Sequence, residues 1–273
     1  MIPLEQLQAG FVLPVDKPRQ WTSFQAVGKV KAVLRNLYGI KNIKIGHAGT
    51  LDPLATGLLL VCIGKATKTI PSLQDADKVY TGTMVLGATT PCFDLEQAID
   101  RYFPFSHISP SLLDSARQQF VGDIMQTPPL FSAVKVDGQR AYELARREDV
   151  PASIAAKPVH VSQFEITAFR PGNNDPLPPL DSPSPAPSQG SRAPHLYDKP
   201  LGSIPSALPQ LDFSIHCGKG TYIRSLARDF GAALGSGAFL ASLRRERVGQ
   251  FSTADALPPE AVEDYLRNST AWA

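Results

Sequence analysis

The sequence of 273 residues has only three cysteines, Cys62, Cys92 and Cys217, and they stand far apart. Without a CxxC pair or a cluster of Cys and His, neither a zinc site nor a disulfide framework is expected. The longest apolar run, Leu58 to Ile63, is far shorter than the roughly 18 residues of a membrane span. Met1 to Gly10 has no basic residue before an apolar stretch, so a signal peptide is not expected. These absences favour a soluble cytoplasmic protein.

Acidic residues are nearly absent from one long stretch, although the net charge of the chain is only +2. Between Asp16 and Asp75, nine Lys or Arg accompany a single acid, Asp52, so this stretch carries +8. A second basic cluster consists of Lys219, Arg224, Arg228, Arg244, Arg245 and Arg247. Such clusters suit a polyphosphate partner. A solvated face balanced by acids elsewhere would explain the charge equally well.

Large aliphatic residues are scarce in 171–206, where ten prolines and six serines occur in 36 residues. A segment of this composition cannot bury enough apolar surface to offset its ordering entropy. The composition predicts a mobile surface loop or linker. It would either separate two domains or form an insertion within one.

The remaining sequence mixes the periodicities of helices and strands. Helical spacing occurs at 24–37, which Thr22 or Ser23 would cap, at 111–121, at 142–147, from 221 onward and at 259–267. Strands are predicted at 79–86, 159–169 and 211–217, and 58–63 is predicted to be a buried strand or a short helix.

The densest chemical signal is the segment GHAGTLDPLATG, from Gly46 to Gly57. Glycines at Gly46, Gly49 and Gly57 allow tight turns and the close approach of a ligand. Pro53 favours an extended backbone at Asp52. Asp52 is surrounded in sequence by cations, so it should stay ionised and could act as a nucleophile or base. Alternatively, it is a turn residue or a structural ion-pair partner.

Other catalytic motifs fail on their spacing. A Walker A loop is excluded because Gly64-Lys65 is followed by Ala66 rather than Ser or Thr. The segment Gly218 to Gly220 begins like a dinucleotide-binding loop, but Ile223 occupies the position of the third glycine. Neither an HExxH motif nor a Ser/His/Asp order is present.

The sequence GHAGTLDPLATGLL resembles the signature of the TruB-type tRNA pseudouridine synthases, which modify uridine 55 in the T loop. Further matching segments follow in the expected order: Asp16-Lys17-Pro18 with Thr22-Ser23, Lys78-Val79-Tyr80 with Leu86-Gly87 and Asp94, Gln126 to Pro129 with residues 132–146, Gly218 to Arg224, and Leu243-Arg244-Arg245. They cover about residues 11–255, apart from the proline-rich segment. The family usually has glycine at the position of Gln20, threonine at Cys92 and tyrosine at Phe131.

The resemblance implies the pseudouridine synthase fold. This is a mixed α/β (α+β) fold with a central mixed, mostly antiparallel sheet flanked by helices and an RNA-gripping insertion at 126–147. Residues 1–255 would form one catalytic domain that contains the flexible Pro/Ser-rich insertion at 171–206. Residues 256–273 would be a short helical tail, and no full PUA-type RNA-binding domain is expected.

The resemblance also implies that Asp52 is the catalytic nucleophile of an enzyme that flips a uridine out of the RNA and isomerises it. Tyr80 would stack on the flipped base, and Arg224 would pair with Asp52 to keep it ionised and oriented. Further residues implied in substrate or RNA binding are His47, Lys17, Leu243, Lys219 and Arg140. Whether Asp52 attacks the ribose, adds to the base or assists deprotonation is left open.

The expected partner is the T arm of tRNA, without a metal, an organic cofactor, a membrane or an obligate protein partner. One alternative is a non-catalytic tRNA-binding or tRNA-folding protein on the same scaffold. Another is a small-molecule phosphotransferase that uses Lys65 or Lys219 on phosphate, which the failed Walker spacing disfavours.

Overall fold

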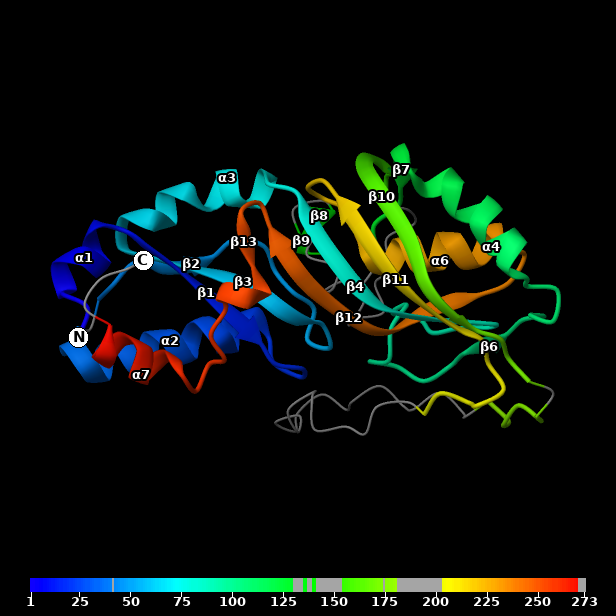
Figure 1. The fold of residues 1–273 in the computed structure, drawn as a ribbon, viewed down its shortest axis with the longest axis horizontal. Helices are drawn as coiled ribbons and strands as arrows, with labels where there is room; N and C mark the ends of the chain where they lie inside the picture. The colour runs from blue at the N-terminus through cyan, green and yellow to red at the C-terminus, as the bar shows by residue number, and fades with distance from the viewer. Residues whose placement is uncertain are drawn as a thin grey trace. The chain divides into compact units, whose positions relative to one another are not determined.

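The structure is a computed structural model that describes residues 1–40, 42–129, 135–136, 139–140, 154–173, 175–180 and 203–269. By their internal contacts the residues form two compact units (Figure 1). Unit 1 comprises Met1–Tyr80 and Leu243–Ala273, and unit 2 comprises Thr81–Ser242. Two strands, β4 (Lys78–Leu86) and β12 (Ala238–Val248), contribute residues to both units.

Unit 1 is built around the strand β3, which is the apolar run found in the sequence. Its elements besides parts of β4 and β12 are α1 (Leu4–Ala9), β1 (Phe11–Lys17), α2 (Ser23–Tyr38), β2 (Ile45–His47), β3 (Thr56–Ile63), η1 (Gly64–Thr69), α3 (Ile70–Asp75), β13 (Phe251–Ser252), η3 (Thr253–Asp255) and α7 (Val262–Asn268). β1 pairs with β3 in antiparallel fashion along its whole length. On the other edge of β3, β12 pairs in parallel with its start and β2 in antiparallel fashion with its end.

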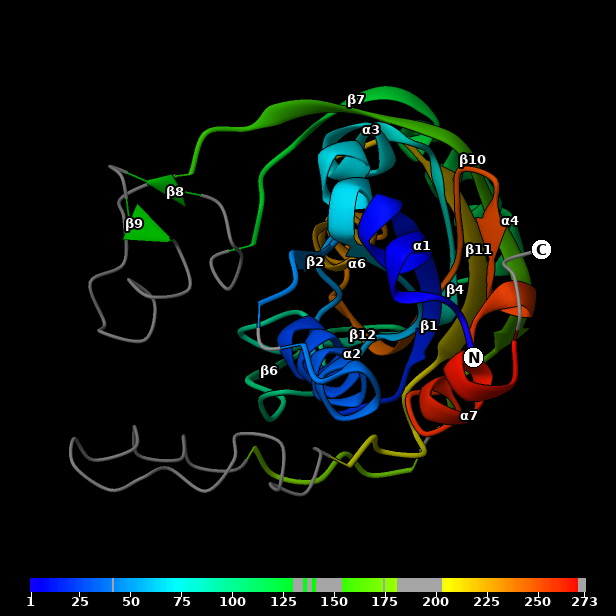
Figure 2. The ribbon, with the colours of Figure 1, turned by 90° about the vertical axis from the view of Figure 1, so that its left-hand side faces the viewer.

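Residues of β3 alternate between two buried faces. Leu58, Leu60 and Cys62 belong to a cluster that also packs against Ile70 and Leu73 of α3. Because strand side chains alternate, the intervening residues face the opposite side. The views agree that α1 and α3 lie on one side of the strands of unit 1, and α2 and α7 on the other (Figure 2). Helices on both sides explain why the apolar run is continuous.

The predicted helix at 24–37 and its cap are confirmed. In α2, the Thr22 side chain accepts the N–H of Gln25 (3.0 Å), and the Gln25 side chain accepts the N–H of Thr22 (2.7 Å). This capping box fixes the first turn. At the other end, Gly39 has φ 66° and closes the helix by donating to the carbonyl of Arg35.

Unit 2 is a sheet with two helices on one face. Its elements are β5 (Ala88–Thr89), β6 (Arg101–Tyr102), α4 (Pro110–Arg117), η2 (Gln118–Phe120), β7 (Gly122–Gln126), β8 (Lys135–Val136), β9 (Gln139–Arg140), β10 (Lys157–Arg170), β11 (Gln210–Cys217) and α6 (Ile223–Ala233). The strand order is β12-β4-β11-β10-β7, and β10 is antiparallel to both of its neighbours. Phe230 of α6 packs against Phe164 of β10, with ring centroids 5.2 Å apart. The expectation of a mixed, mostly antiparallel sheet flanked by helices is confirmed.

Several predicted segments fall partly or wholly outside the described residues. Within the predicted RNA-gripping insertion, β8 and β9 form an antiparallel hairpin, with Lys135 opposite Arg140. The helix predicted at 142–147 and most of the proline-rich segment lie outside the described residues. The single domain expected over 1–255 stays a prediction. None of the described helices combines the length and the apolar character that crossing a bilayer requires.

The pairing of β3 with β12 predicts a strict requirement for glycine at Gly57. Gly57 has φ 96°, and a Cβ at this position would collide with the backbone of Arg245. We expect Gly57→Ala to lower the free energy of unfolding by about 2–4 kcal/mol, because strain and collision add. Urea unfolding measures this change. The control is Gly122→Ala, where φ is 95° but an added Cβ meets nothing within 4 Å, so that only about 1 kcal/mol of strain is expected. Equal losses would contradict the prediction.

Candidate active site

Asp52 lies on the loop between β2 and β3, in unit 1, and its side chain is half-buried. The N–H of Ala55 donates to the carbonyl of Asp52 (3.1 Å), which closes a tight turn over Pro53 and Leu54. The loop therefore enters the buried strand β3 directly after the carboxylate.

Lys17, the last residue of β1, is completely buried beside this loop. Its ammonium group donates to three backbone carbonyl groups, those of Trp21 (2.6 Å), Pro18 (3.1 Å) and Pro53 (3.2 Å). Burial lowers the pKa of Lys17 to about 8, against the opposing effect of the Asp52 charge. The ammonium group thus joins the segment after β1 to the loop of Asp52. This geometry favours a positioning role over the predicted contact with RNA.

The segment after β1 and the first residue of α2 hold both neighbours of Asp52. The N–H of Gln20 donates to the carbonyl of Pro53 (2.9 Å). Ser23 Oγ accepts the N–H of Leu51 (2.9 Å) and donates to its carbonyl (3.2 Å). Gln20 has φ 67°, a conformation that glycine adopts without strain. Although glutamine replaces the usual glycine of the family, the backbone keeps a glycine-like conformation.

Arg245 of β12 holds the other side of the loop. It is 1% exposed, and its guanidinium group donates to the carbonyls of Leu58 (2.8 Å) and Gly49 (3.0 Å). Its positive charge also lowers the pKa of Lys17. Next to it in β12, Arg244 makes a bidentate ion pair with Asp16 (2.8 and 3.0 Å). Asp52 therefore lies on a loop that two buried cations hold by its backbone.

His47 ends β2 and is partly buried. Burial and the charge of Arg245 lower its pKa, while a hydrogen bond with the backbone of Gly49 acts in the opposite direction. The Nδ1 atom is buried and finds no hydrogen-bond partner among the described residues. Burial and the charge of Arg245 thus both favour the neutral imidazole. Its predicted place in the space left by the flipped base stays a prediction.

Two further predicted site residues belong to the same unit as Asp52. Tyr80 of β4 is 9% exposed. Leu243 of β12 is partly buried, and its carbonyl lies 3.5 Å from the hydroxyl of Thr56, which donates to it. Their roles in base stacking and in the pocket wall stay predictions.

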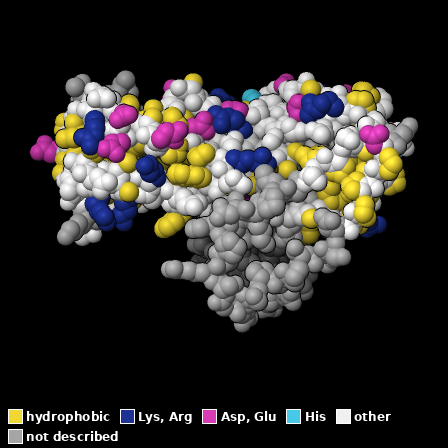
Figure 3. Space-filling view, turned by 90° about the horizontal axis from the view of Figure 1, so that it is seen from below, with side chains coloured by type: hydrophobic (Ala, Val, Ile, Leu, Met, Phe, Trp, Pro, Cys, Tyr) yellow, Lys and Arg dark blue, Asp and Glu magenta, His cyan; other side chains and the backbone are white. Residues whose placement is uncertain are grey.

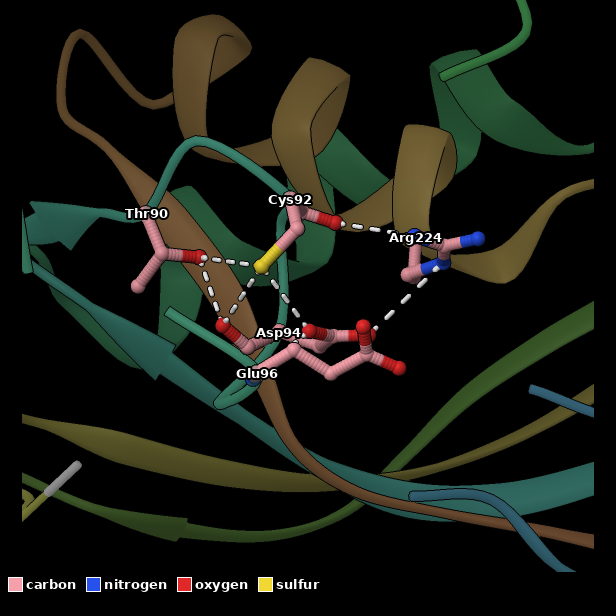
Figure 4. A network of polar contacts seen from close by, with 5 residues as sticks. All are labelled: Thr90, Cys92, Asp94, Glu96 and Arg224. Atoms are coloured by element: carbon pink, nitrogen blue, oxygen red, sulfur yellow. Dashed lines mark hydrogen bonds and ion pairs between the residues drawn. The ribbon is translucent and has the colours of Figure 1, made fainter. Parts of the chain in front are cut away.

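Arg224 lies in unit 2, in the first turn of α6, and forms a buried polar cluster with Asp94 (Figure 4). The two residues are 4% and 5% exposed, and Nε of Arg224 lies 3.8 Å from Oδ2 of Asp94. Nη1 of Arg224 also donates to the carbonyl of Cys92 (3.1 Å). Arg224 and Asp52 belong to different units, so the predicted ion pair between them stays a prediction.

Asp94 is itself fixed by its surroundings (Figure 4). Its Oδ1 accepts the thiol of Cys92 (3.0 Å) and the N–H of Glu96 (2.9 Å), and its carbonyl accepts the hydroxyl of Thr90 (2.7 Å). Burial, followed by the charge of Asp94, raises the pKa of the Cys92 thiol. Cys92 therefore acts as a hydrogen-bond donor, and not as a reactive thiolate.

The entry into α6 is fixed by Gln126, which is 2% exposed. Its amide accepts the N–H of Tyr222 (2.8 Å) and donates to the carbonyl of the same residue (3.1 Å). Because Tyr222 precedes α6, this contact positions the helix that carries Arg224. Lys219 is exposed, and the side chain of Arg140 lies outside the described residues.

Sequence reasoning did not predict the positioning roles of Ser23, Gln126 and Arg245. All three lie within segments that match the family. The sequence feature that could have pointed to them is that they are polar residues, without an expected chemical role, inside segments that match the family. Their partners are backbone groups of other segments, and no pattern in the sequence names such partners.

Two family models match the chain. The model "TruB family pseudouridylate synthase (N terminal domain)" matches residues 35–175, more than half of the chain. The model "tRNA pseudouridylate synthase B C-terminal domain" matches residues 224–271. The chain belongs to the TruB family.

Individual proteins agree with the family models. The chain is 44% identical over 268 residues to the tRNA pseudouridine synthase B of Flavobacterium johnsoniae, which covers 98% of this chain and 100% of that protein. It is 43% identical to the protein of that name from Phocaeicola vulgatus, over 94% of this chain and 93% of that protein. Among solved structures, one from the "Crystal Structure of a Cbf5-Nop10-Gar1 Complex" has a TM-score of 0.61 and 27% identity. That match covers 96% of this chain and 56% of the other.

The two hydrogen bonds between Ser23 Oγ and the backbone of Leu51 predict that removing the hydroxyl group loosens the loop that carries Asp52. Ser23→Ala leaves the N–H and the carbonyl of Leu51 without their partner in a buried site. We expect the free energy of unfolding to fall by about 1–3 kcal/mol and the Leu51 amide proton to exchange faster. The control is Ser72→Ala, which removes an exposed hydrogen bond to Thr69 and should change stability by less than about 0.5 kcal/mol. An unchanged exchange rate of the Leu51 amide proton would show that Ser23 does not hold this part of the loop.

The burial of Lys17 predicts a pH-dependent contribution to stability. Because the pKa falls from 10.5 to about 8 on folding, the unfolded chain binds more protons between these pH values. Stability at this site must therefore rise with pH in that window. We expect the difference in unfolding free energy between the unaltered protein and Lys17→Met to grow by about 3 kcal/mol from pH 8 to 10.5. The same comparison with Lys29→Met, at an exposed position, should show no slope. A flat difference for Lys17→Met would contradict the pKa shift.

Proposed function

We propose that this protein isomerises uridine to pseudouridine in tRNA. The observation that carries the proposal is Asp52, a single carboxylate in a strongly basic stretch, on a loop that Lys17, Ser23 and Arg245 hold through its backbone. Identity of 44% with a tRNA pseudouridine synthase B along its entire length supports this function.

The reaction needs a carboxylate and no redox partner. The bond between N1 of the uracil and C1′ of the ribose breaks, the base turns, and a bond from C5 to C1′ forms. The proton at C5 leaves, and N1 ends protonated. An ionised Asp52 could attack C1′, add to the base, or assist deprotonation of the sugar. All three routes require the carboxylate to stay in place while the base is detached, which agrees with a tightly held loop.

The proposed substrate site is the T arm of tRNA, with uridine 55 as the target. Its unpaired loop offers bases that can be flipped, stacked and hydrogen-bonded. Tyr80 would stack on the flipped base, with Leu243 in the pocket wall and His47 in the vacated space. Arg224 would pair with Asp52. Lys219 and Arg140 would contact phosphates. We further propose a cytoplasmic location and no obligate protein partner.

The test of this proposal is Asp52→Asn, which keeps the size of the side chain but removes its charge. We expect pseudouridine formation in a T-arm RNA to fall below about one thousandth of that of the unaltered protein. RNA affinity should change little, because the phosphate contacts remain. Pseudouridine is measured by chemical derivatisation and primer extension.

The matched control for Asp52→Asn is Asp123→Asn, which changes an exposed carboxylate of β7 in unit 2. This variant should keep full activity. Substantial turnover by Asp52→Asn would refute the role of Asp52. RNA binding without any turnover by the unaltered protein would instead favour a non-catalytic tRNA-binding protein.

A further inference from the structure

One exposed face of α2 carries a row of residues that the fold of unit 1 does not explain. At 100° per residue, positions 24, 28, 31 and 35 lie within about 60° of each other around the helix. The residues in this row are Phe24, Gly28, Lys31 and Arg35, and all four are exposed. Buried side chains of α2 on the opposite side include Ala26 and Val33. We call this row the α2 stripe.

Phe24 starts the stripe with an aromatic ring that is 82% exposed. A single exposed apolar residue needs no explanation by itself, so its position is what matters. Ser23, its neighbour, holds Leu51 by two hydrogen bonds, and Leu51 precedes Asp52. Phe24 is therefore exposed and directly follows the residue that holds the loop of the proposed catalytic carboxylate.

Gly28 is the second member, and nothing in the fold requires a glycine there. It lies in the middle of a helix, outside the left-handed region, and an added Cβ would meet nothing within 4 Å. Glycine destabilises such a position relative to alanine. A bare stretch of backbone is useful where another molecule lies close to the helix.

Lys31 and Arg35 complete the stripe with two positive charges. The sequence of α2 contains no Asp or Glu, so the helix itself does not neutralise them. Figure 3 shows the side of unit 1 on which α2 and α7 lie, with both Lys or Arg and Asp or Glu side chains at its surface. An aromatic ring followed by a bare backbone and two cations is the combination that suits an unpaired nucleic acid strand.

We propose that the α2 stripe binds an unpaired strand of the RNA substrate, beside the target uridine. One base stacks on Phe24, the strand passes over Gly28, and its phosphates lie at Lys31 and Arg35. This inference rests on the proposed function, because its occupant is the RNA that brings uridine to Asp52. A neutral or basic partner would leave both cations without an anion.

The first test measures the affinity of a T-arm RNA by fluorescence anisotropy, in an Asp52→Asn background that prevents turnover. Phe24→Ala should weaken binding about tenfold, as expected for the loss of one stacked base. Phe24→Trp should bind within about twofold of the background, since it keeps a stacking surface. Phe24→Leu, which keeps apolar area but no aromatic face, should resemble the alanine variant. All should unfold at the temperature of the background, because the side chain is exposed.

The second test separates a binding role of Gly28 from a structural one. Gly28→Leu should preserve or raise the thermal stability of the protein, because leucine favours helix and the space is open. The same variant should weaken RNA binding at least about fivefold by occupying the path of the strand, a smaller effect than a full base stack. A glycine retained for folding would give the opposite pattern, with lower stability and unchanged binding.

The third test uses salt and a matched control. Lys31→Ala should reduce the slope of log affinity against log salt concentration by about one, as expected for the loss of one phosphate contact. Lys29 is also exposed on α2 but lies more than about 90° from each member of the stripe. Lys29→Ala should therefore leave the slope unchanged. Phe24→Ala should weaken binding without changing the slope, since no ionic contact is lost.

The outcomes distinguish this inference from the function on which it rests. If Phe24→Ala and Gly28→Leu bind RNA like the background while the unaltered protein forms pseudouridine, the inference is wrong and the proposed function stands. Equal effects of Lys29→Ala and Lys31→Ala on the slope also contradict the stripe. If the unaltered protein neither binds nor modifies RNA, both proposals fail.

Discussion

The buried ammonium group of Lys17 is the interaction on which the geometry around Asp52 depends. It joins three carbonyl groups, two from the segment after β1 and one from the residue after Asp52. An apolar side chain of the same length would fill the space but leave these carbonyls without a donor. The cost of burying a charge is visible in the lowered pKa. Burial of Lys17 thus disfavours its charged form, while the hydrogen bonds of its ammonium group fix the loop.

Lys17 and Arg245 give the loop an unusual electrostatic setting. Both cations are buried, and their hydrogen bonds go to carbonyl oxygens rather than to carboxylates. Arg244 shows the alternative, since its charge is matched by Asp16. Both side chains thus add positive charge beside the loop of Asp52. The same field disfavours a charged imidazole at His47. Such a site suits a reaction in which an anionic group must persist.

Much of the fold could be predicted from sequence, because periodicity reports burial. The helix at 24–37 and the strands β4, β10 and β11 follow from it, whereas 58–63, which forms β3, was predicted to be either a buried strand or a short helix. β1 and β12 were missed for a physical reason: Pro14 interrupts β1, and three Arg and one Glu hide the alternation of β12. Asp52 could be singled out as a candidate nucleophile or base from local chemistry, but its catalytic role follows from the resemblance alone and stays a prediction. The hydrogen bonds from Arg245 to the carbonyls of Leu58 and Gly49 could not be predicted, because they join residues 187 and 196 positions apart in the sequence.

The parallel pairing of β12 with β3 has a consequence for the time course of biosynthesis. Asp52 leaves the ribosome early, but Arg245, which holds its loop, is made 187 residues after Leu58. At 5–20 residues per second, this delay is roughly 10–40 s. Throughout it, the loop lacks its second anchor and β3 lacks the neighbour that packs on Gly57. A nascent chain therefore carries Asp52 on an incompletely held loop until the residues of β12 have been made.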